Sequence, residues 1–169
     1  MANPHVHLED WLRDAYAMER QAETLLDAQA ERVGHYPALQ DRLRGHLDAT
    51  RRQQALVDAC LQRLGTAPSA IKDLAARFAG YGQVAGDMMA TDEVVKGAMA
   101  VYAFEQVEIA AYTALVAAAR AAGEEEIRAC CERILKDEHD MAAWLLRHLP
   151  ALTTAFLDRS AVDRIDAKR

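Results

Sequence analysis

The sequence predicts an all-α domain, and three observations support that prediction. About a fifth of the residues are alanine, which has the highest helix propensity, and only 6% are aromatic. The four prolines stand far enough apart to leave room for long helices, whose interiors exclude proline. Apolar side chains recur at steps of three and four residues in the intervals between them, which is typical of amphipathic helices.

Proline and glycine mark where each long helix is expected to begin and end. Pro4 and Pro37 suit the first turn of a helix, and Thr91 suits the N-cap of another. Pro150 is expected to end the last long helix. The predicted long helices span residues 4–33, 37–64, 92–122 and 124–149, with the glycine caps Gly34, Gly65 and Gly123 after the first three.

The other segments are expected to hold short helices and a tail. Ser69 caps a short helix over residues 69–78, within the long connection between the second and third long helices. Residues 152–157 form a short C-terminal helix, and residues 159–169 form a charged tail. Residues 1–158 are therefore expected to make a single domain.

The lengths of the connections predict the topology. The two tight connections force antiparallel helix pairs, whereas the long connection can return the third helix to the other end of the bundle. One such crossover is typical of ferritin-like bundles. We therefore expect a ferritin-like four-helix bundle with one long crossover between the second and third helices.

Charge and composition exclude several classes of function. The formal net charge of -6 and the pI near 5.5 do not suit nucleic-acid binding. No apolar run is long enough to span a membrane, and residues 1–10 lack the pattern of a signal peptide, so we expect a cytoplasmic protein. The three cysteines show no zinc or redox spacing, so they are interpreted as small buried residues: Cys60, Cys130 and Cys131.

Every long helix carries a carboxylate or an imidazole on its apolar side, near its midpoint. These residues are Glu19, His46, Glu105, Glu108 and Glu138. Burying one unpaired carboxylate costs several kcal/mol, so acids on several helices at mid-length indicate a shared cation. The alternative is a structural network of the acids with His46 and nearby basic residues, namely Arg42, Arg44, Arg51, Arg52 and Lys136.

Counting from the turns places these residues at similar levels. Glu108 precedes Gly123 by as many residues as Glu138 follows it, so the two lie level in an antiparallel pair. The same count from Gly34 sets Glu19 level with Ala49, which is one helical turn from His46.

Four segments resemble the YciE/YciF-like proteins, a ferritin-like group of bacterial stress proteins. The segments are residues 12–21; residues 46–53, similar to His-Leu-x-Glu-Thr-x-x-Gln; residues 105–112, similar to Glu-His-x-Glu-Ile-x-x-Tyr; and residues 135–138, similar to Leu-x-Glu-Glu. The resemblance covers about residues 8–149. It implies a buried two-metal carboxylate site with Glu19, His46, Glu105, Glu108 and Glu138 as ligand candidates.

The chain departs from the family pattern at the site itself. Ala49 stands where the motif has a glutamate, Gln106 replaces a histidine, and Met141 follows Glu138 where two-metal sites carry a histidine. Asp48 points elsewhere around the helix, and His139 is interpreted as half-buried. Three alternatives stay open: a partly degraded di-metal site, a single-metal site, or an empty polar core. The oxygen-rich donor set suits iron or manganese.

Two functions follow from these alternatives. The first is a stress-associated metal protein with oxidase, peroxide or metal-handling chemistry, and the second is a non-enzymatic structural or interaction protein with a vestigial site and no cofactor. Tyr102 and Tyr112, which flank the acids of the third helix, are interpreted as core residues. A homodimer is expected, and the sequence names neither a substrate nor a catalytic residue.

Overall fold

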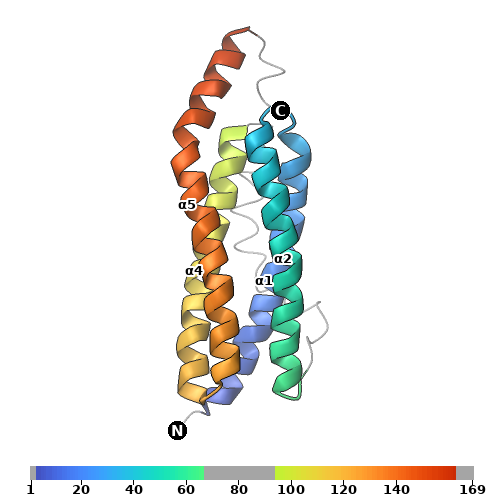
Figure 1. The fold of residues 1–169 in the computed structure, drawn as a ribbon, viewed down its shortest axis with the longest axis vertical. Helices are drawn as coiled ribbons and strands as arrows, with labels where there is room; N and C mark the ends of the chain where they lie inside the picture. The colour runs from blue at the N-terminus through green and yellow to red at the C-terminus, as the bar shows by residue number, and fades with distance from the viewer. Residues whose placement is uncertain (1–2, 67–93, 163–169) are drawn as a thin grey trace.

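The computed structural model describes residues 3–66 and 94–162 of the chain. Four long helices lie side by side along a common axis (Figure 1). They are α1 (Pro4–Arg32), α2 (Pro37–Arg63), α4 (Val94–Ala122) and α5 (Glu125–Val162). The predicted all-α four-helix bundle is confirmed.

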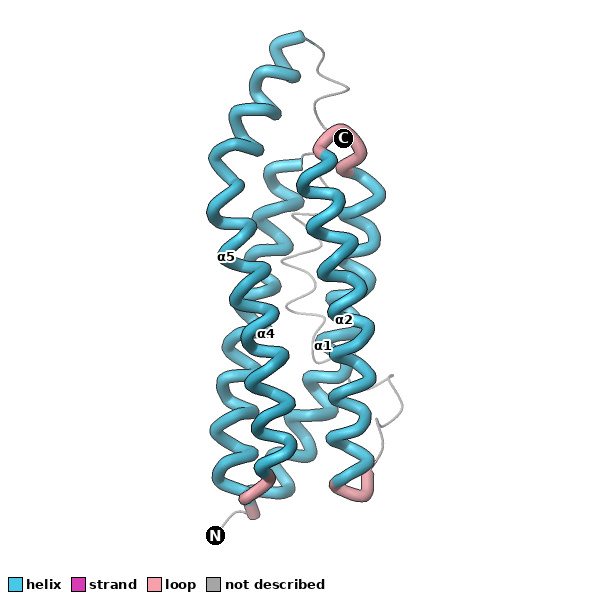
Figure 2. Tube along the Cα trace, in the orientation of Figure 1, coloured by secondary structure: helices cyan, strands magenta, loops and turns pink. Residues whose placement is uncertain are grey.

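The helices run as two antiparallel pairs, α1 with α2 and α4 with α5 (Figure 2). The α2 helix ends at the end of the bundle where α1 begins, whereas α4 begins at the opposite end (Figure 1). The end of α2 and the start of α4 therefore lie at opposite ends of the bundle, as a crossover between these helices requires. The short helix expected over residues 69–78 and the expected cap at Thr91 lie outside the described residues.

The helix ends follow the sequence closely, with one difference. The side chain of Asn3 caps α1 by accepting a hydrogen bond from the backbone N–H of His5, at 3.1 Å. Gly65 and Gly123 adopt left-handed φ values of 75° and 74° after α2 and α4. Gly34 lies in the turn after α1 without a positive φ, and that turn is closed by the N–H of Tyr36, which donates to the carbonyl of Val33 at 2.9 Å.

The prediction that Pro150 ends a helix is wrong. The α5 helix continues through Pro150 to Val162, so the separate helix expected over residues 152–157 is its last part. Proline removes the N–H that would bond the carbonyl of Leu146, but the side chain of Leu146 is 56% exposed, so water has access to this side of the helix. Beyond the proline, Thr153 donates to the carbonyl of Leu149 at 2.8 Å.

Apolar side chains from all four helices fill the interior. The largest of those that are fully buried include Leu8, Leu12, Met18, Leu26, Leu39, Leu43, Leu61, Leu115, Ile127, Ile134 and Met141. Cys60 and Cys131 are buried as predicted, whereas Cys130 is half-buried. None of the described helices is long and apolar enough to cross a membrane.

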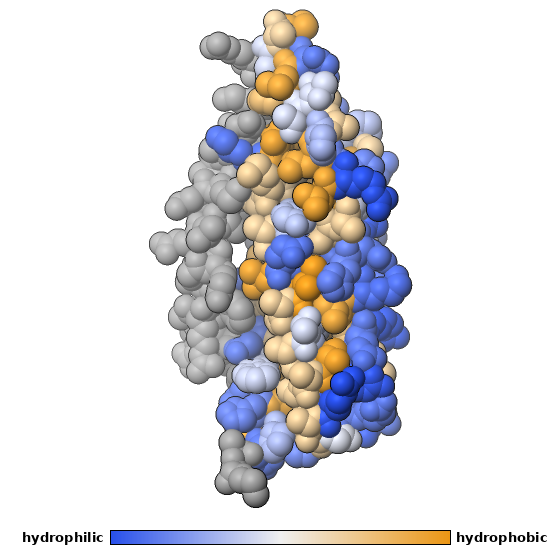
Figure 3. Space-filling model, turned by 90° about the vertical axis from the view of Figure 1, so that its left-hand side faces the viewer, coloured by the Kyte–Doolittle hydropathy of each residue, from blue (hydrophilic) through white to orange (hydrophobic). Residues whose placement is uncertain are grey.

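Apolar side chains also gather outside the core. Figure 3 shows a band of them along one face of the molecule. Met99 of α4 and Leu146 and Leu157 of α5 are among the exposed large apolar residues. A homodimer would need an apolar face of this kind, and the homodimer stays a prediction.

Candidate metal centre

The five candidate ligands all lie inside the bundle, near the middle of their helices. Glu19 comes from α1, His46 from α2, Glu105 and Glu108 from α4, and Glu138 from α5. The four glutamates are at most 1% exposed and His46 is 5% exposed. Each helix turns these residues inward because they share a stripe with its core side chains.

His46, Glu105 and Glu138 form the most compact part of this group. The Nε2 atom of His46 lies 3.1 Å from Oε2 of Glu105 and 3.1 Å from Oε2 of Glu138. One donor atom from each residue lies within 4.8 Å of the other two, which is close enough for all three to bind a single ion. One imidazole and two carboxylates from three helices therefore form a group that could hold a metal.

Two neighbouring polar side chains of α2 form hydrogen bonds to residues of this group. Gln53 donates from Nε2 to Oε1 of Glu138 at 2.7 Å, which holds the carboxylate beside His46. The Thr50 hydroxyl donates to the backbone carbonyl of His46 at 3.1 Å. Gln53 and Thr50 interrupt the apolar face of α2 in the sequence, but only the folded arrangement shows which groups they contact.

Glu19 has a partner that the sequence did not predict. The hydroxyl of Tyr112 donates to Oε1 of Glu19, across the interface between α1 and α4. Tyr112 is a core residue, as expected, but it also orients an acid. The Glu-x-x-Glu-x-x-x-Tyr spacing of α4 sets this tyrosine one turn after Glu108, on the same face, and that was the signal available in the sequence.

Several oxygens in the centre have no hydrogen-bond donor. Within the described residues these are Oε2 of Glu19, Oε2 of Glu105, Oε1 of Glu108 and Oε1 of Gln53. Oε2 of Glu105 is near Nε2 of His46, but without the geometry of a hydrogen bond. No lysine or arginine in the described ranges forms an ion pair with the four glutamates, so the alternative of a structural network rests there on His46, which contacts Glu105 and Glu138. Unsatisfied buried oxygens are costly, and a bound cation would satisfy them.

Burial changes the protonation of the centre. It raises the pKa of Glu105 to about 8, and raises the pKa values of Glu19 and Glu108 well above their ordinary range. Burial lowers the pKa of His46, but the carboxylates of Glu105 and Glu138 outweigh it and raise this pKa to about 10. The metal-free centre therefore holds protons that a cation would displace.

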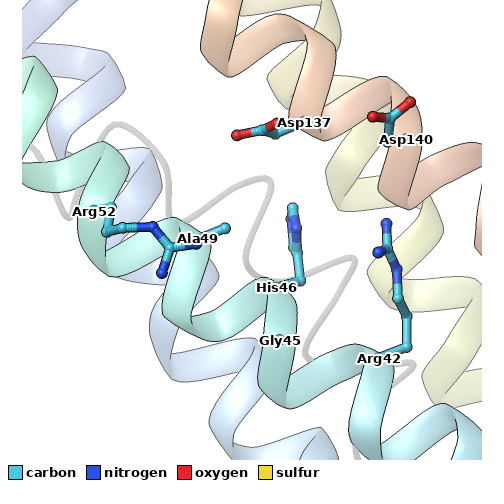
Figure 4. A pocket seen from close by; sticks show the side chains of 7 residues that line it. All are labelled: Arg42, Gly45, His46, Ala49, Arg52, Asp137 and Asp140. Carbon is cyan, nitrogen blue, oxygen red and sulfur yellow. The ribbon is translucent and has the colours of Figure 1, made fainter.

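A pocket of about 160 Å³ reaches the centre from the surface between α2 and α5 (Figure 4). Its lining residues are Arg42, Gly45, His46, Ala49 and Arg52 of α2, and Asp137 and Asp140 of α5. Ala49 lies beside His46 in this wall, so its small side chain contributes to the opening.

Two further residues that adjoin the candidate ligands in the sequence, Asp48 and His139, lie at exposed positions. The Asp48 side chain is 66% exposed and lies 3.6 Å from Arg51. His139 is exposed, not half-buried as predicted, because its position on α5 follows the inward-facing Glu138 by about 100°.

Comparison with known proteins now places the chain. Residues 3–158 match the family model described as a domain of unknown function, DUF892. The chain belongs to the DUF892 family. This is the YciE/YciF-like, ferritin-like group that the sequence motifs resemble.

Two solved structures share the DUF892 fold of this chain. Protein XCC3681 from Xanthomonas campestris pv. campestris is 44% identical, with a TM-score of 0.81, and the match covers 95% of this chain and 99% of that one. YcfI from Rhodopseudomonas palustris, proposed to be a structural protein, is 24% identical, with a TM-score of 0.70 over 86% of this chain and 94% of its own. The second likeness concerns the fold alone.

Proposed function

We propose that this DUF892 domain is a stress-associated metal protein that binds two ions of iron or manganese in the centre of its bundle. The observation that carries the proposal is the group of His46, Glu105 and Glu138, surrounded by buried carboxylate oxygens without donors. A core of this kind is costly when it is empty, whereas divalent cations stabilise it.

The residues present fit such ions. His46, Glu105 and Glu138 would hold one ion, and Glu108 and Glu19 would supply carboxylates for the second. Several carboxylates with one imidazole suit iron or manganese better than copper. Bound iron or manganese would supply redox chemistry toward oxygen or peroxide, or a store of metal. The protein binds the ions, orients Glu19 through Tyr112 and Glu138 through Gln53, and surrounds the centre with apolar side chains.

Anaerobic loading with Fe²⁺ or Mn²⁺, followed by elemental analysis, tests the proposal. We expect the wild type to retain metal after gel filtration, and Glu138→Gln to lose most of it, because the substitution removes a charged oxygen donor at nearly constant volume. Glu126→Gln on the same helix is the matched control, since that side chain is 74% exposed. A wild type that retains no metal after loading with either ion would contradict the proposal.

A second function is favoured by one specific observation. Ala49 leaves the centre without a donor at a position beside His46. A non-enzymatic structural or interaction protein with a vestigial site would show the same melting temperature with and without a chelator. The metal protein would instead melt at a lower temperature when chelator is present, because a ligand that binds only the folded state stabilises it.

A further inference from the structure

The pocket between α2 and α5 meets the centre at one residue. Its wall includes His46 and none of the four buried glutamates. Those glutamates are at most 1% exposed, so a solute in this pocket contacts the imidazole before any buried carboxylate. Figure 4 shows the His46 ring directed from α2 toward α5, across the pocket.

Two small residues on α2 keep the pocket open. Gly45 precedes His46, and Ala49 follows it by one turn on the same wall. A Cβ atom added at Gly45 would meet nothing within 4 Å. Glycine inside a helix costs about 1 kcal/mol relative to alanine, and no close packing at this position requires it. The gap is large enough for a hydrated ion or another small solute.

The donor atoms of the centre favour a cation as the occupant. Four buried carboxyl groups lie below the pocket beside one imidazole, and several of their oxygens have no hydrogen-bond donor. At the mouth, Arg42 and Arg52 of α2 line the pocket together with Asp137 and Asp140 of α5 (Figure 4), so the mouth itself is nearly neutral. A small anion would meet carboxyl oxygens without donors, whereas a divalent cation would bind these oxygens and displace the protons of the centre.

One of the two mouth carboxylates is better placed to receive a cation. Asp140 already pairs with Nζ of Lys136 at 2.6 Å, and Arg42 extends from α2 toward it (Figure 4). Asp137 forms no ion pair within the described part of the chain and is only partly exposed. A hydrated cation at the mouth therefore finds an uncommitted carboxylate at Asp137.

We propose that this pocket is the entry path of the divalent cation, in which Asp137 receives the ion and Gly45 and Ala49 leave room for it to reach His46. The path rests on the proposed metal function. The proposed path gives a kinetic role to residues that are not ligands. The rate of metal uptake therefore tests the path, whereas the metal content at equilibrium tests the metal function.

The test is a stopped-flow measurement of Co²⁺ uptake, in which Co²⁺ serves as an optical stand-in for Fe²⁺ and elemental analysis gives the content at equilibrium. In Gly45→Leu the added side chain fills the pocket, so uptake must wait for local opening of the bundle and slows about tenfold or more. Ala49→Leu should do the same. Ala55→Leu, at an exposed position of the same helix, is the matched control and keeps the wild-type rate.

Two variants that change the charge of the mouth give a second test, because they should change the uptake rate in opposite directions. Asp137→Asn is expected to slow uptake about threefold at low ionic strength, and Arg52→Gln to accelerate it, with both effects fading in high salt. Equal uptake rates in the wild type, Gly45→Leu and Ala49→Leu, at normal metal content, would overturn the entry path and leave the metal function intact. A wild type without metal at equilibrium would overturn both.

Discussion

The two sides of the centre differ in how they treat their acids. On the side of α1 and α4, Glu19 is fully buried and accepts a hydrogen bond from Tyr112, and Glu108 is buried beside it. On the side of α2 and α5, Glu138 accepts a hydrogen bond from Gln53 and contacts His46, but a pocket opens next to them at Ala49. The α1 and α4 helices also pack more extensively against each other than α2 and α5 do.

This difference indicates a division of roles within one bundle. Close packing on the first side holds carboxylates in place and excludes water, which strengthens their interaction with any charge nearby. Looser packing between α2 and α5 buries less apolar surface but gives solvent access to His46. A site closed on every side would be stable but slow to fill with metal. This centre instead has a closed side, formed by α1 and α4, and an open side, formed by α2 and α5.

The largest effect that sharpens the comparison concerns pH. The pKa of Glu105 is raised from about 4.5 to about 8 by burial, and that of His46 from 6.5 to about 10 by the neighbouring carboxylates. In both cases the folded state binds protons more tightly than the unfolded state. The free energy of unfolding of the metal-free protein should therefore fall as pH rises from 5 to 9, by about 1.4 kcal/mol per pH unit for each extra proton.

Urea unfolding at several pH values, with chelator or with Mn²⁺, measures this slope. Mn²⁺ should flatten it, because the metal already displaces the protons and binds better as pH rises. His46→Gln should remove the contribution of the open side to the pH dependence of the unfolding free energy above pH 6.5. Glu19→Gln should remove a contribution of the closed side. A metal-free stability that rises with pH over this range would contradict the burial of these groups as protonated acids.

The next effect comes from closing the open side. In Ala49→Glu a carboxylate enters the pocket beside His46 and adds an oxygen donor to the centre. We expect the second ion to bind at least about tenfold more tightly, because even groups that only support the ligands of a metal change its affinity by about tenfold or more. Titration with Mn²⁺ under argon, followed by elemental analysis, measures the change.

The control for this variant is Ala55→Glu, which adds the same charge at an exposed position of α2. If both variants raise the affinity equally, the gain comes from net charge and not from a donor in the pocket. If Ala49→Glu lowers the metal content, metal binding requires the open pocket. Ala49 is then an adaptation of the site and not the loss of a ligand.

The comparison also shows which features were predictable from sequence. Prolines, glycines and apolar periodicity predicted four helices with bounds close to those observed, except at the end of α5, and the same stripes predicted that Glu19 and Glu138 face inward. Local signals failed at Pro150, because the missing hydrogen bond falls on an accessible side of α5 and does not stop the helix. Contacts between helices, such as Tyr112 with Glu19, depend on the packing of α1 against α4, which spacing along one chain segment does not determine.

The smallest effect tests the closed side directly. Tyr112→Phe removes the hydroxyl that donates to Glu19 and leaves the ring in the core, so the loss is one buried hydrogen bond, about 1–2 kcal/mol of unfolding free energy. Tyr102→Phe is the matched control, since Tyr102 is a half-buried tyrosine of the same helix for which the described residues show no hydroxyl partner.

The same variant should also affect metal binding. Burial raises the pKa of Glu19 and the Tyr112 hydrogen bond opposes that rise, so Tyr112→Phe should raise the pKa of Glu19 further. Metal binding near neutral pH should then weaken in Tyr112→Phe but not in Tyr102→Phe. Equal metal affinity in the two variants would mean that the closed side contributes stability to the bundle and no ligand to the ion.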